Sequence, residues 1–358
     1  MGEATGGVYV HVPFCTRRCD YCAFATWTDR AHLMADYVEA CRRELEAAAP
    51  APATTVFFGG GTPSLLPPEL LASLLAAVPR RADAEVTVEC NPETVTPALL
   101  RAYREAGVTR LSFGVQSMVP HVLVGLGRQH APGSVPAAVA AAREAGFESW
   151  NVDLVYGGAG ESVDDWRRTL EEVLALEPPH VSAYALTVEP GTPLAADAAR
   201  HPDDDDQAEK YLLAEDALVG AGLRNYEVSN WAQHGHECRH NLLYWRQGDY
   251  RGIGCAAHSH RAGRRWWNVR TPERYIAAVA AGASVVAGEE VLDDEARAAE
   301  RLQLALRTRD GVPRDALDAD DEALDGLVEP ADRPGFVRLT PRGRLLATPL
   351  ALFLDPGR

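Results

Sequence analysis

The chain has 358 residues, of which 46% are hydrophobic, and a formal net charge of −16. A chain of this length and apolar content can bury a large core, and the length suits one large domain with a smaller one appended. The excess of acidic residues repels phosphate backbones, so nucleic acid is a poor candidate partner. No stretch approaches 18 consecutive uncharged apolar residues, so no membrane span is predicted.

The first half of the chain alternates predicted strands with predicted helices. Apolar runs rich in β-branched residues predict six strands, at residues 8–12, 55–58, 85–90, 110–115, 150–156 and 180–187. Amphipathic stretches predict five helices between them, at residues 29–49, 68–78, 97–106, 135–145 and 163–176. This alternation favours a parallel sheet with right-handed crossovers, either open or closed into an incomplete barrel. In both architectures ligands collect at the C-terminal ends of the strands.

Three cysteines directly follow the first predicted strand, in the sequence CTRRCDYC: Cys15, Cys19 and Cys22. Three thiolates at this spacing can hold three irons of a four-iron cluster and leave the fourth iron open to an outside ligand. A structural zinc site would need a fourth protein ligand, such as His11 or Cys238. A disulfide is disfavoured because the seven cysteines are an odd number and no hydrophobic signal segment precedes the first strand. We therefore expect a cytoplasmic protein.

Glycine-rich or polar segments follow the other predicted strands. The second strand runs into GGGTPS, residues 59–64, where the backbone could approach a ligand closely because glycine has no Cβ, although a plain tight turn is the alternative. The next three strands carry Glu89, Gln116 and Asp153 among apolar residues. A polar ligand across the end of the sheet would satisfy all three, and hydrogen bonds between neighbouring strands would explain each one separately.

Several segments taken together resemble the radical S-adenosylmethionine (radical SAM) family: VYVHVPFCTRRCDYCAF, FFGGGTPSLL, VECNPETV, RLSFGVQS with LGRQH, and NVDLVYGGAGES. Within that family the sequence is most similar to the heme-chaperone branch, HemW, which is related to oxygen-independent coproporphyrinogen III oxidase. The likeness runs from Tyr9 to the C-terminal segment LTPRGRLLA. It implies an α/β fold, a partial (β/α)6 barrel followed by a small, mostly helical, winged-helix-like C-terminal domain.

The resemblance also implies cofactors. Cys15, Cys19 and Cys22 would bind a [4Fe-4S] cluster, whose open iron would take the amino and carboxylate groups of SAM, and an electron donor would reduce the cluster. The residues implied to line the methionine and adenosine portions of SAM are Tyr9, Gly60, Gly61, Thr62 and Glu89. A second group, which matches SAM-contacting positions of the related oxidase, is Tyr21, Gln116, Arg128 and Asp153. Binding of one SAM molecule and binding of two both remain open.

Two departures point away from coproporphyrinogen oxidation. The decarboxylating oxidases have a fourth cysteine two residues after the motif, and Phe24 stands at that position here. The chain also begins only a few residues before the first predicted strand, where those oxidases carry a long N-terminal arm. A radical SAM methyltransferase or cyclopropane-forming enzyme acting on a small aromatic substrate is an alternative to the heme chaperone. A coproporphyrinogen III dehydrogenase is a weaker alternative.

Five of the eleven histidines fall within residues 234–260. This enrichment predicts a ligand- or metal-binding segment, and solvated loop histidines are the alternative. The sequence HNLLYW within it resembles the heme-contacting motif of the HemW branch, which implies that His240 gives heme an axial nitrogen while the aromatic residues pack on the macrocycle. The resemblance implies heme and a heme-acceptor protein as partners, and it allows a peripheral membrane contact where the acceptor resides.

The C-terminal part of the chain is predicted to be small and helical. A long charged helix is expected from Thr271 to about Thr308, and a short hairpin then leads to a final helix. We therefore expect three parts. These are a radical SAM core domain over residues 1–235, a histidine-rich connecting segment over 236–270, and a C-terminal domain over 271–358.

Overall fold

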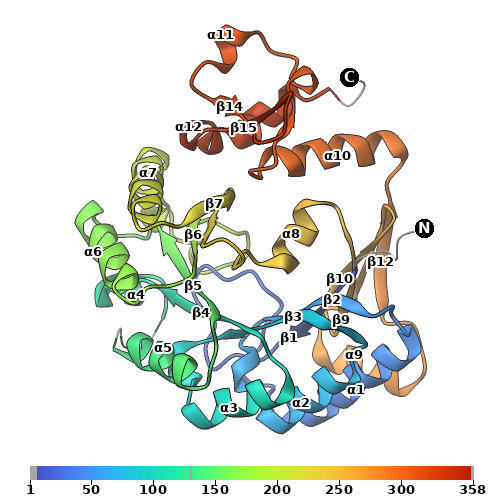
Figure 1. Ribbon diagram of the computed structural model, residues 1–358. Helices are drawn as coiled ribbons and strands as arrows, with labels where there is room; N and C mark the ends of the chain where they lie inside the picture. Colours follow the sequence, from blue (N-terminus) through green and yellow to red (C-terminus); the bar gives the residue numbers. More distant parts are fainter. Residues whose placement is uncertain (1–5, 129–130, 132, 356–358) are drawn as a thin grey trace.

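The computed structural model describes residues 6–128, 131 and 133–355. Within these residues, twelve strands form one curved sheet in the order β12-β11-β10-β9-β1-β2-β3-β4-β5-β6-β8-β7. Helices cover its convex face, and a separate C-terminal unit lies across its concave side (Figure 1). The architecture agrees with the predicted incomplete barrel followed by a small C-terminal domain.

Six parallel strands form the centre of the sheet: β1 (Gly6–Val12), β2 (Ala53–Gly60), β3 (Arg80–Cys90), β4 (Arg110–Gln116), β5 (Ser149–Tyr156) and β6 (His180–Ala185). All six predicted strands are thus confirmed. Side chains alternate between the two faces of each strand. In β1, Val8, Val10 and Val12 belong to the apolar core, whereas Tyr9 and His11 lie on the opposite, concave face.

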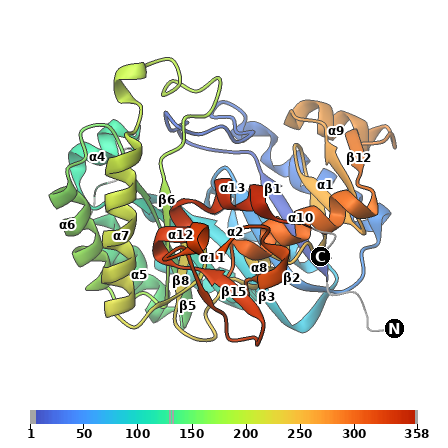
Figure 2. The same cartoon turned by 90° about the horizontal axis from the view of Figure 1, so that it is seen from above.

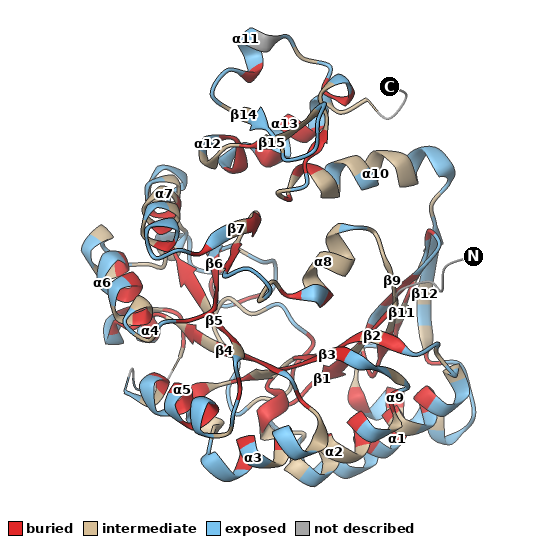
Figure 3. Cartoon of the chain, in the orientation of Figure 1, coloured by how far each residue is buried: buried red, intermediate tan, exposed pale blue. Residues whose placement is uncertain are grey.

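The helices on the convex face are α1 (Met34–Ala48), α2 (Pro68–Ala77), α3 (Pro97–Ala106), α4 (Pro120–Gly125), α5 (Ser134–Glu144) and α6 (Val163–Leu174). Each of the five helices predicted between the strands is present, and α4 is an additional helix. Ser162 and Asp165 form a capping box at the start of α6, and Gly107 ends α3 in the left-handed region, with φ of +98°. The buried side chains concentrate on the sheet and on the helix faces turned toward it (Figure 3).

The sheet continues beyond β1 with strands that were not predicted. Strand β9 (Asp249–Ile253) pairs in parallel with β1. Three antiparallel strands follow: β10 (His258–Arg261), β11 (Arg264–Asn268) and β12 (Val286–Val291). The expected long helix after Thr271 is wrong, because Gly282 ends the first part at φ of +63° and the next residues pair with β11. Two helices therefore flank β12: α9 (Pro272–Ala280) and α10 (Asp294–Leu306).

The other edge of the sheet and its concave side are formed by the next elements, which are α7 (Asp204–Gly220), β7 (Arg224–Glu227), β8 (Asn230–Ala232) and α8 (Arg239–Trp245). Helix α8 contains the whole of HNLLYW and lies inside the curve of the sheet, against β1 and β2 (Figure 1). No helix among the described residues is long and apolar enough to cross a membrane.

A second hydrophobic core holds the C-terminal unit together, with Leu306, Val312, Leu317, Leu339 and Leu350 at its centre. Its elements are α10, β13 (Val312–Pro313), α11 (Asp321–Leu324), β14 (Val328–Pro330), β15 (Phe336–Leu339), α12 (Pro341–Leu345) and α13 (Ala347–Leu350). Seen from above, this unit covers the concave side of the main sheet (Figure 2). Helix α9 and β12 instead pack with the main sheet. The division of the chain at residues 235 and 271 stays a prediction.

Candidate functional site

The three cysteines of CTRRCDYC lie in the loop that follows β1, at the C-terminal end of the parallel strands. Backbone hydrogen bonds fix the loop: Cys15 N donates to Trp27 O at 3.1 Å, and Cys22 N donates to Cys19 O at 3.2 Å. All three thiols are half-buried. Among the described residues, no three His, Cys, Asp or Glu side chains are arranged to hold a single metal ion.

The glycine-rich loop after β2 packs directly on the cysteine loop. Gly61 N donates to Val12 O and Thr62 N donates to Phe14 O, both at 2.8 Å. A Cβ atom at Gly61 would lie 2.6 Å from Phe14 O and 3.1 Å from Cys15 Sγ, so a larger residue could not be accommodated without moving the cysteine loop. The two loops therefore form one unit at this end of the barrel.

Gly60 connects this unit to the interior of the barrel. Its φ is +108°, and a Cβ atom there would lie 2.5 Å from the His11 ring. Gly60 N donates to Glu89 Oε2 at 3.1 Å, and the hydroxyl of Tyr9 is 3.1 Å from His11 Nδ1. Tyr9, Gly60 and Glu89, three of the residues predicted to line SAM, thus lie together.

A chain of hydrogen bonds connects two of the cysteines. Thr62 Oγ1 donates to Cys15 Sγ at 3.6 Å, and Asn91 Nδ2 donates to Thr62 Oγ1 at 3.3 Å. Arg128 Nη2 donates to Asn91 Oδ1 at 3.0 Å, and its Nη1 donates to Cys19 Sγ at 3.6 Å. Burial raises the pKa of Cys15, and the Thr62 bond opposes that shift. A hydroxyl and a guanidinium are donors suited to sulfur ligands of iron.

Asn91 is a central member of this chain that sequence reasoning missed. It directly follows β3. Its position at the end of a parallel strand is the feature of the sequence that could have identified it. Arg128 comes from the segment LGRQH, of which residues 129 and 130 lie outside the described residues.

Gln116 and Tyr21 lie beside Arg128. Gln116 has a φ of +65°, a left-handed backbone conformation that is uncommon for a residue with a side chain. A Cβ atom at Gly114 would lie 3.0 Å from Gln116 Nε2 and 3.4 Å from Arg128 Nη2. Burial and the nearby Cys19 raise the pKa of Tyr21, whereas Arg128 lowers it. The structure therefore groups both predicted residues with the cysteine loop.

Two half-buried carboxyl groups, those of Asp153 and Glu89, lie inside the barrel. Asp153 Oδ2 accepts from Ser112 Oγ and Asp153 Oδ1 accepts from Asn151 Nδ2, both at 2.8 Å. Burial raises the pKa of Asp153, although these hydrogen bonds oppose the shift. Burial, followed by the charge of Asp153, raises the pKa of Glu89 to about 8. A positively charged ligand group beside these carboxyls would be stabilised.

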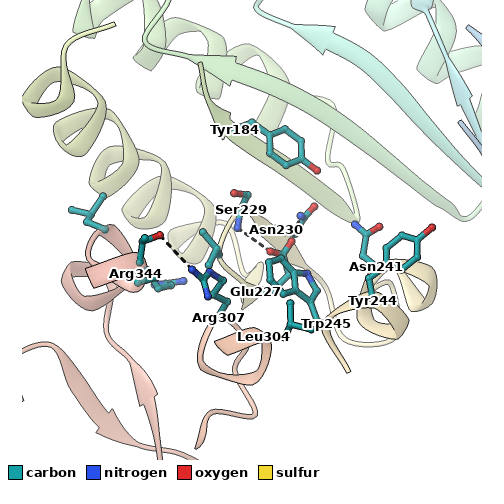
Figure 4. A pocket seen from close by; sticks show the side chains of 14 residues that line it. Tyr184, Glu227, Ser229, Asn230, Asn241, Tyr244, Trp245, Leu304, Arg307 and Arg344 are labelled. Carbon is teal, nitrogen blue, oxygen red and sulfur yellow. Dashed lines mark hydrogen bonds between the residues drawn. The ribbon is translucent and has the colours of Figure 1, made fainter. Parts of the chain in front are cut away.

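The aromatic residues of α8 line a cavity of about 500 Å³ between the barrel and the C-terminal unit. The barrel side includes Tyr184, Tyr244 and Trp245, and the other side includes Leu304 and Arg307 (Figure 4). A cavity of this size, with aromatic walls and a set of polar and charged side chains, suits a small-molecule ligand with a flat ring system.

Backbone pairing attaches the C-terminal unit to the barrel next to this cavity. Val228 N donates to Arg307 O at 3.0 Å, and Arg309 N donates to Tyr226 O at 3.0 Å. Two ion pairs also join the two parts of the chain, Arg309 with Glu237 at 2.8 Å and the more buried Arg344 with Glu215 at 2.7 Å. The cavity therefore exists only while the two parts of the chain are docked.

Comparison with known proteins agrees with this architecture. Residues 9–173 match the Radical SAM superfamily. A curated relative, the heme chaperone HemW of Mycobacterium tuberculosis, is 45% identical over 95% of this chain and 92% of its own length. The chain belongs to the HemW family of radical SAM proteins. The HemW protein of Escherichia coli is 39% identical over 70% of this chain and 69% of its own length.

A solved structure shares the fold of this HemW-family chain. Coproporphyrinogen III oxidase (HemN) from Escherichia coli, a radical SAM enzyme, superimposes with a TM-score of 0.84 over 99% of this chain and 90% of that chain. Its sequence identity is 24%, so the likeness establishes the fold alone.

The histidine of HNLLYW in this HemW-family chain lies inside the protein, where both of its ring nitrogens have partners. His240 is 1% exposed. Its Nδ1 is 2.8 Å from Thr55 Oγ1, and its Nε2 is 2.8 Å from the Tyr244 hydroxyl. The ring stacks on Phe57 at 5.3 Å, and burial lowers its pKa to about 3. Both ring nitrogens bond within the protein in this arrangement, and the bond to the Tyr244 hydroxyl holds that side chain. The role of His240 as an axial ligand of heme stays a prediction.

Tyr244 connects the cavity with the predicted SAM-lining residues. Burial raises its pKa, and the neighbouring Tyr9 and Glu89 are among the groups that raise it further. The HemW-family motif thus places one aromatic side chain between the interior of the barrel and the cavity under the C-terminal unit.

Proposed function

We propose that the protein is a heme chaperone that binds heme in the cavity between α8 and the C-terminal unit and passes it to an acceptor protein. The observation that carries the proposal is the cavity of about 500 Å³ with Tyr184, Tyr244 and Trp245 on its barrel side. Aromatic side chains can stack on or pack edge-on against a macrocycle. The relatives named as heme chaperones support the same conclusion.

A [4Fe-4S] cluster fits the donor set of the cysteine loop, and Cys15, Cys19 and Cys22 would hold it. When bound, such a cluster supplies one-electron chemistry toward SAM, and an electron donor would be a further partner. Arg128 and Thr62 would stabilise the sulfur ligands, because each donates a hydrogen bond to one of these sulfurs at 3.6 Å.

SAM fits the interior of the barrel next to the cysteine loop. Glu89 and Asp153 are half-buried carboxyls whose raised pKa values reflect the cost of negative charge there. The positive charge of the SAM sulfonium or ammonium would offset that cost. Gly60 and Gly61 would let the backbone approach SAM closely, and Tyr9 would contribute an aromatic wall.

Transfer of heme follows from the position of the cavity between two parts of the chain. Tyr184 is 40% exposed and lies at the edge of the cavity, on β6. Movement of the C-terminal unit away from the barrel would open the cavity from this side and expose heme to an acceptor. We place this transfer in the cytoplasm, with contact at a membrane where an acceptor resides.

Titration with hemin tests the proposal. We expect the full chain, purified without oxygen, to give a saturable shift of the Soret band at one hemin per chain. Trp245→Ala should raise the Kd for hemin by about tenfold, because it removes an aromatic wall of the cavity. Trp267→Ala is the matched control, since Trp267 is also half-buried but stacks on His258, outside the cavity. Absence of saturable binding, or equal losses in the two variants, would refute the proposal.

A further inference from the structure

We propose that the cavity recognises carboxylate groups on its ligand through Arg307, with Arg344 supplying a second positive charge. The ligand class is then a flat ring system that bears carboxylates. This inference rests on the proposed function, since heme is such a ring system and carries two propionate groups.

Arg307 presents its guanidinium at the wall of the cavity. Its Nη1 donates to Gln303 O at 2.7 Å, and its Nη2 donates to Thr348 Oγ1 at 3.3 Å. These two bonds hold the side chain between α10 and α13. Arg307 forms no ion pair with any residue that the structure describes, so its charge is available to an anionic ligand.

Arg344 lines the same cavity and is buried, with 9% of its surface exposed. Its Nη2 pairs with Glu215 Oε1 at 2.7 Å. Its Nε and Nη1 atoms have no hydrogen-bond partner among the described residues. These two nitrogens are shielded from solvent, and the guanidinium lies over the Tyr211 ring at 5.7 Å, so Arg344 acts on a ligand through its positive charge beside the cavity.

The charges around the cavity favour an anion. Two guanidinium groups line it against one carboxyl group, that of Glu227, among the described residues. Glu227 Oε2 accepts from Ser229 N at 3.2 Å, and Glu227 Oε1 accepts from the amide of Asn230. Burial raises the pKa of Glu227 to about 7, so this carboxyl is partly neutral at neutral pH.

The walls around these charges define the rest of the ligand. Trp245 on α8 and Leu304 on α10 form apolar surfaces, and Leu345 adds another from α12. A ligand that fills this space has an extended apolar body, and its carboxylates lie at the end of the cavity that carries the arginines (Figure 4). A free carboxylate without a ring system would satisfy the arginines but leave the apolar walls unfilled.

Comparison of hemin with its dimethyl ester tests the inference, because esterification removes both carboxylate charges and keeps the ring. We expect wild-type protein to bind hemin about tenfold or more tightly than the ester, since one charge-assisted contact is worth about that factor. Arg307→Gln should lose this preference while its affinity for the ester stays unchanged. Arg307→Lys should keep part of the preference.

Arg309→Gln is the matched control. Arg309 pairs with Glu237 at 2.8 Å across the same interface but does not line the cavity, so the preference for hemin should survive. Equal binding of hemin and ester by wild-type protein would overturn the inference without any variant, and so would an equal loss of both affinities in Arg307→Gln. Absence of saturable binding of either compound would instead refute the proposed heme chaperone.

Discussion

The imidazole of His240 shows how far a residue can be interpreted from its motif. Its presence in HNLLYW predicted a role at a ligand site, and in the structure it bonds to Tyr244, which lines the cavity. Its bond to Thr55 spans 185 residues of sequence, and its bond to Tyr244 is formed within α8. The first partner depends on where α8 docks in the barrel, so the bond to Thr55 was not predictable from local sequence.

The burial of His240 leads to a prediction about pH. The pKa of this residue is about 3 in the folded protein, against about 6.5 in an unfolded chain. Between these values the unfolded state binds a proton that the folded state does not. The free energy of unfolding therefore falls as the pH falls, by up to about 1.4 kcal/mol per pH unit. His240→Gln removes this titration, so we expect a shallower slope between pH 4 and 6 in urea denaturation.

The matched control for this measurement is His234→Gln. His234 is exposed and lies six residues earlier in the same histidine-rich segment. Its replacement should leave the pH dependence of stability as it is in the wild type. A slope for His240→Gln that equals the wild-type slope would show that His240 is not the buried, neutral residue described here.

Residues at the strand ends were predicted with more success than those of the cavity. The C-terminal ends of parallel strands meet at one edge of a sheet, so Cys15, Glu89 and Gln116 could be expected to lie together from order alone. Asn91 fulfils the same condition and was missed because a polar residue just after a strand is also common in ordinary turns. Its contact with Arg128 appears only in three dimensions.

At the scale of elements, helix α8 depends on a carboxylate from a distant strand. Glu85 of β3 accepts hydrogen bonds from Arg239 N and His240 N, both at 3.1 Å. Cys238, at the N-cap position, provides no side-chain cap. The first N–H groups of a helix are unpaired and carry partial positive charge, so an anion stabilises them. The barrel thus supplies the cap that the sequence before α8 lacks.

Replacement of Glu85 by Gln tests this anchoring. The amide keeps one oxygen acceptor but loses the charge and the second acceptor, so we expect the free energy of unfolding to fall by about 1–2 kcal/mol. Asp83→Asn is the control, because Asp83 lies on the same strand with an exposed side chain and contacts α8 through its backbone carbonyl alone. Its loss should stay within about 0.5 kcal/mol. Urea denaturation of both variants measures these free energies of unfolding. Equal losses in the two variants would contradict the role of Glu85 as the cap of α8.

The strands differ in how well their sequences identify them. The six central strands are covered by helices, so their residues form apolar runs that can be recognised. Strands β11 and β12 lie at the edge of the sheet, where β12 has mainly exposed side chains, including Glu289 and Glu290. Such strands form because they pair with neighbouring strands. Their local sequence pattern is that of a charged helix or a loop, so it does not identify them.

For the whole molecule, the cavity depends on how the C-terminal unit docks onto the barrel. Tyr244 and Trp245 could be predicted from the family motif, but the opposite wall with Arg307 and Arg344 comes from a separate core. Nothing in the local sequence of these arginines indicates a ligand, because arginines near helix ends are common on protein surfaces. Their importance arises from the pairing of Tyr226 and Val228 with residues 307–309.

Glu215→Gln is expected to loosen this docking. The side chains of Arg344 and Glu215 are 7% and 13% exposed, so the variant leaves a buried guanidinium without its counter-charge. Breaking a buried pair on one side costs about 3–5 kcal/mol. Glu215 also accepts from Trp231 Nε1 at 2.7 Å, a bond that the glutamine oxygen can keep. We therefore expect the C-terminal unit to separate more readily, with faster proteolysis between α9 and α10 and weaker hemin binding.

Glu329→Gln separates this effect from a general loss of negative charge. Glu329 pairs with Arg338 at 2.8 Å inside the C-terminal unit, and the two side chains are 46% and 32% exposed. A solvent-exposed pair contributes about 1 kcal/mol or less, so this variant should keep both its resistance to protease and its affinity for hemin. If the two variants behaved alike, docking would not depend on the buried pair. If Glu215→Gln were cleaved faster yet bound hemin as tightly as wild type, the heme site would lie within the barrel instead of between the two units.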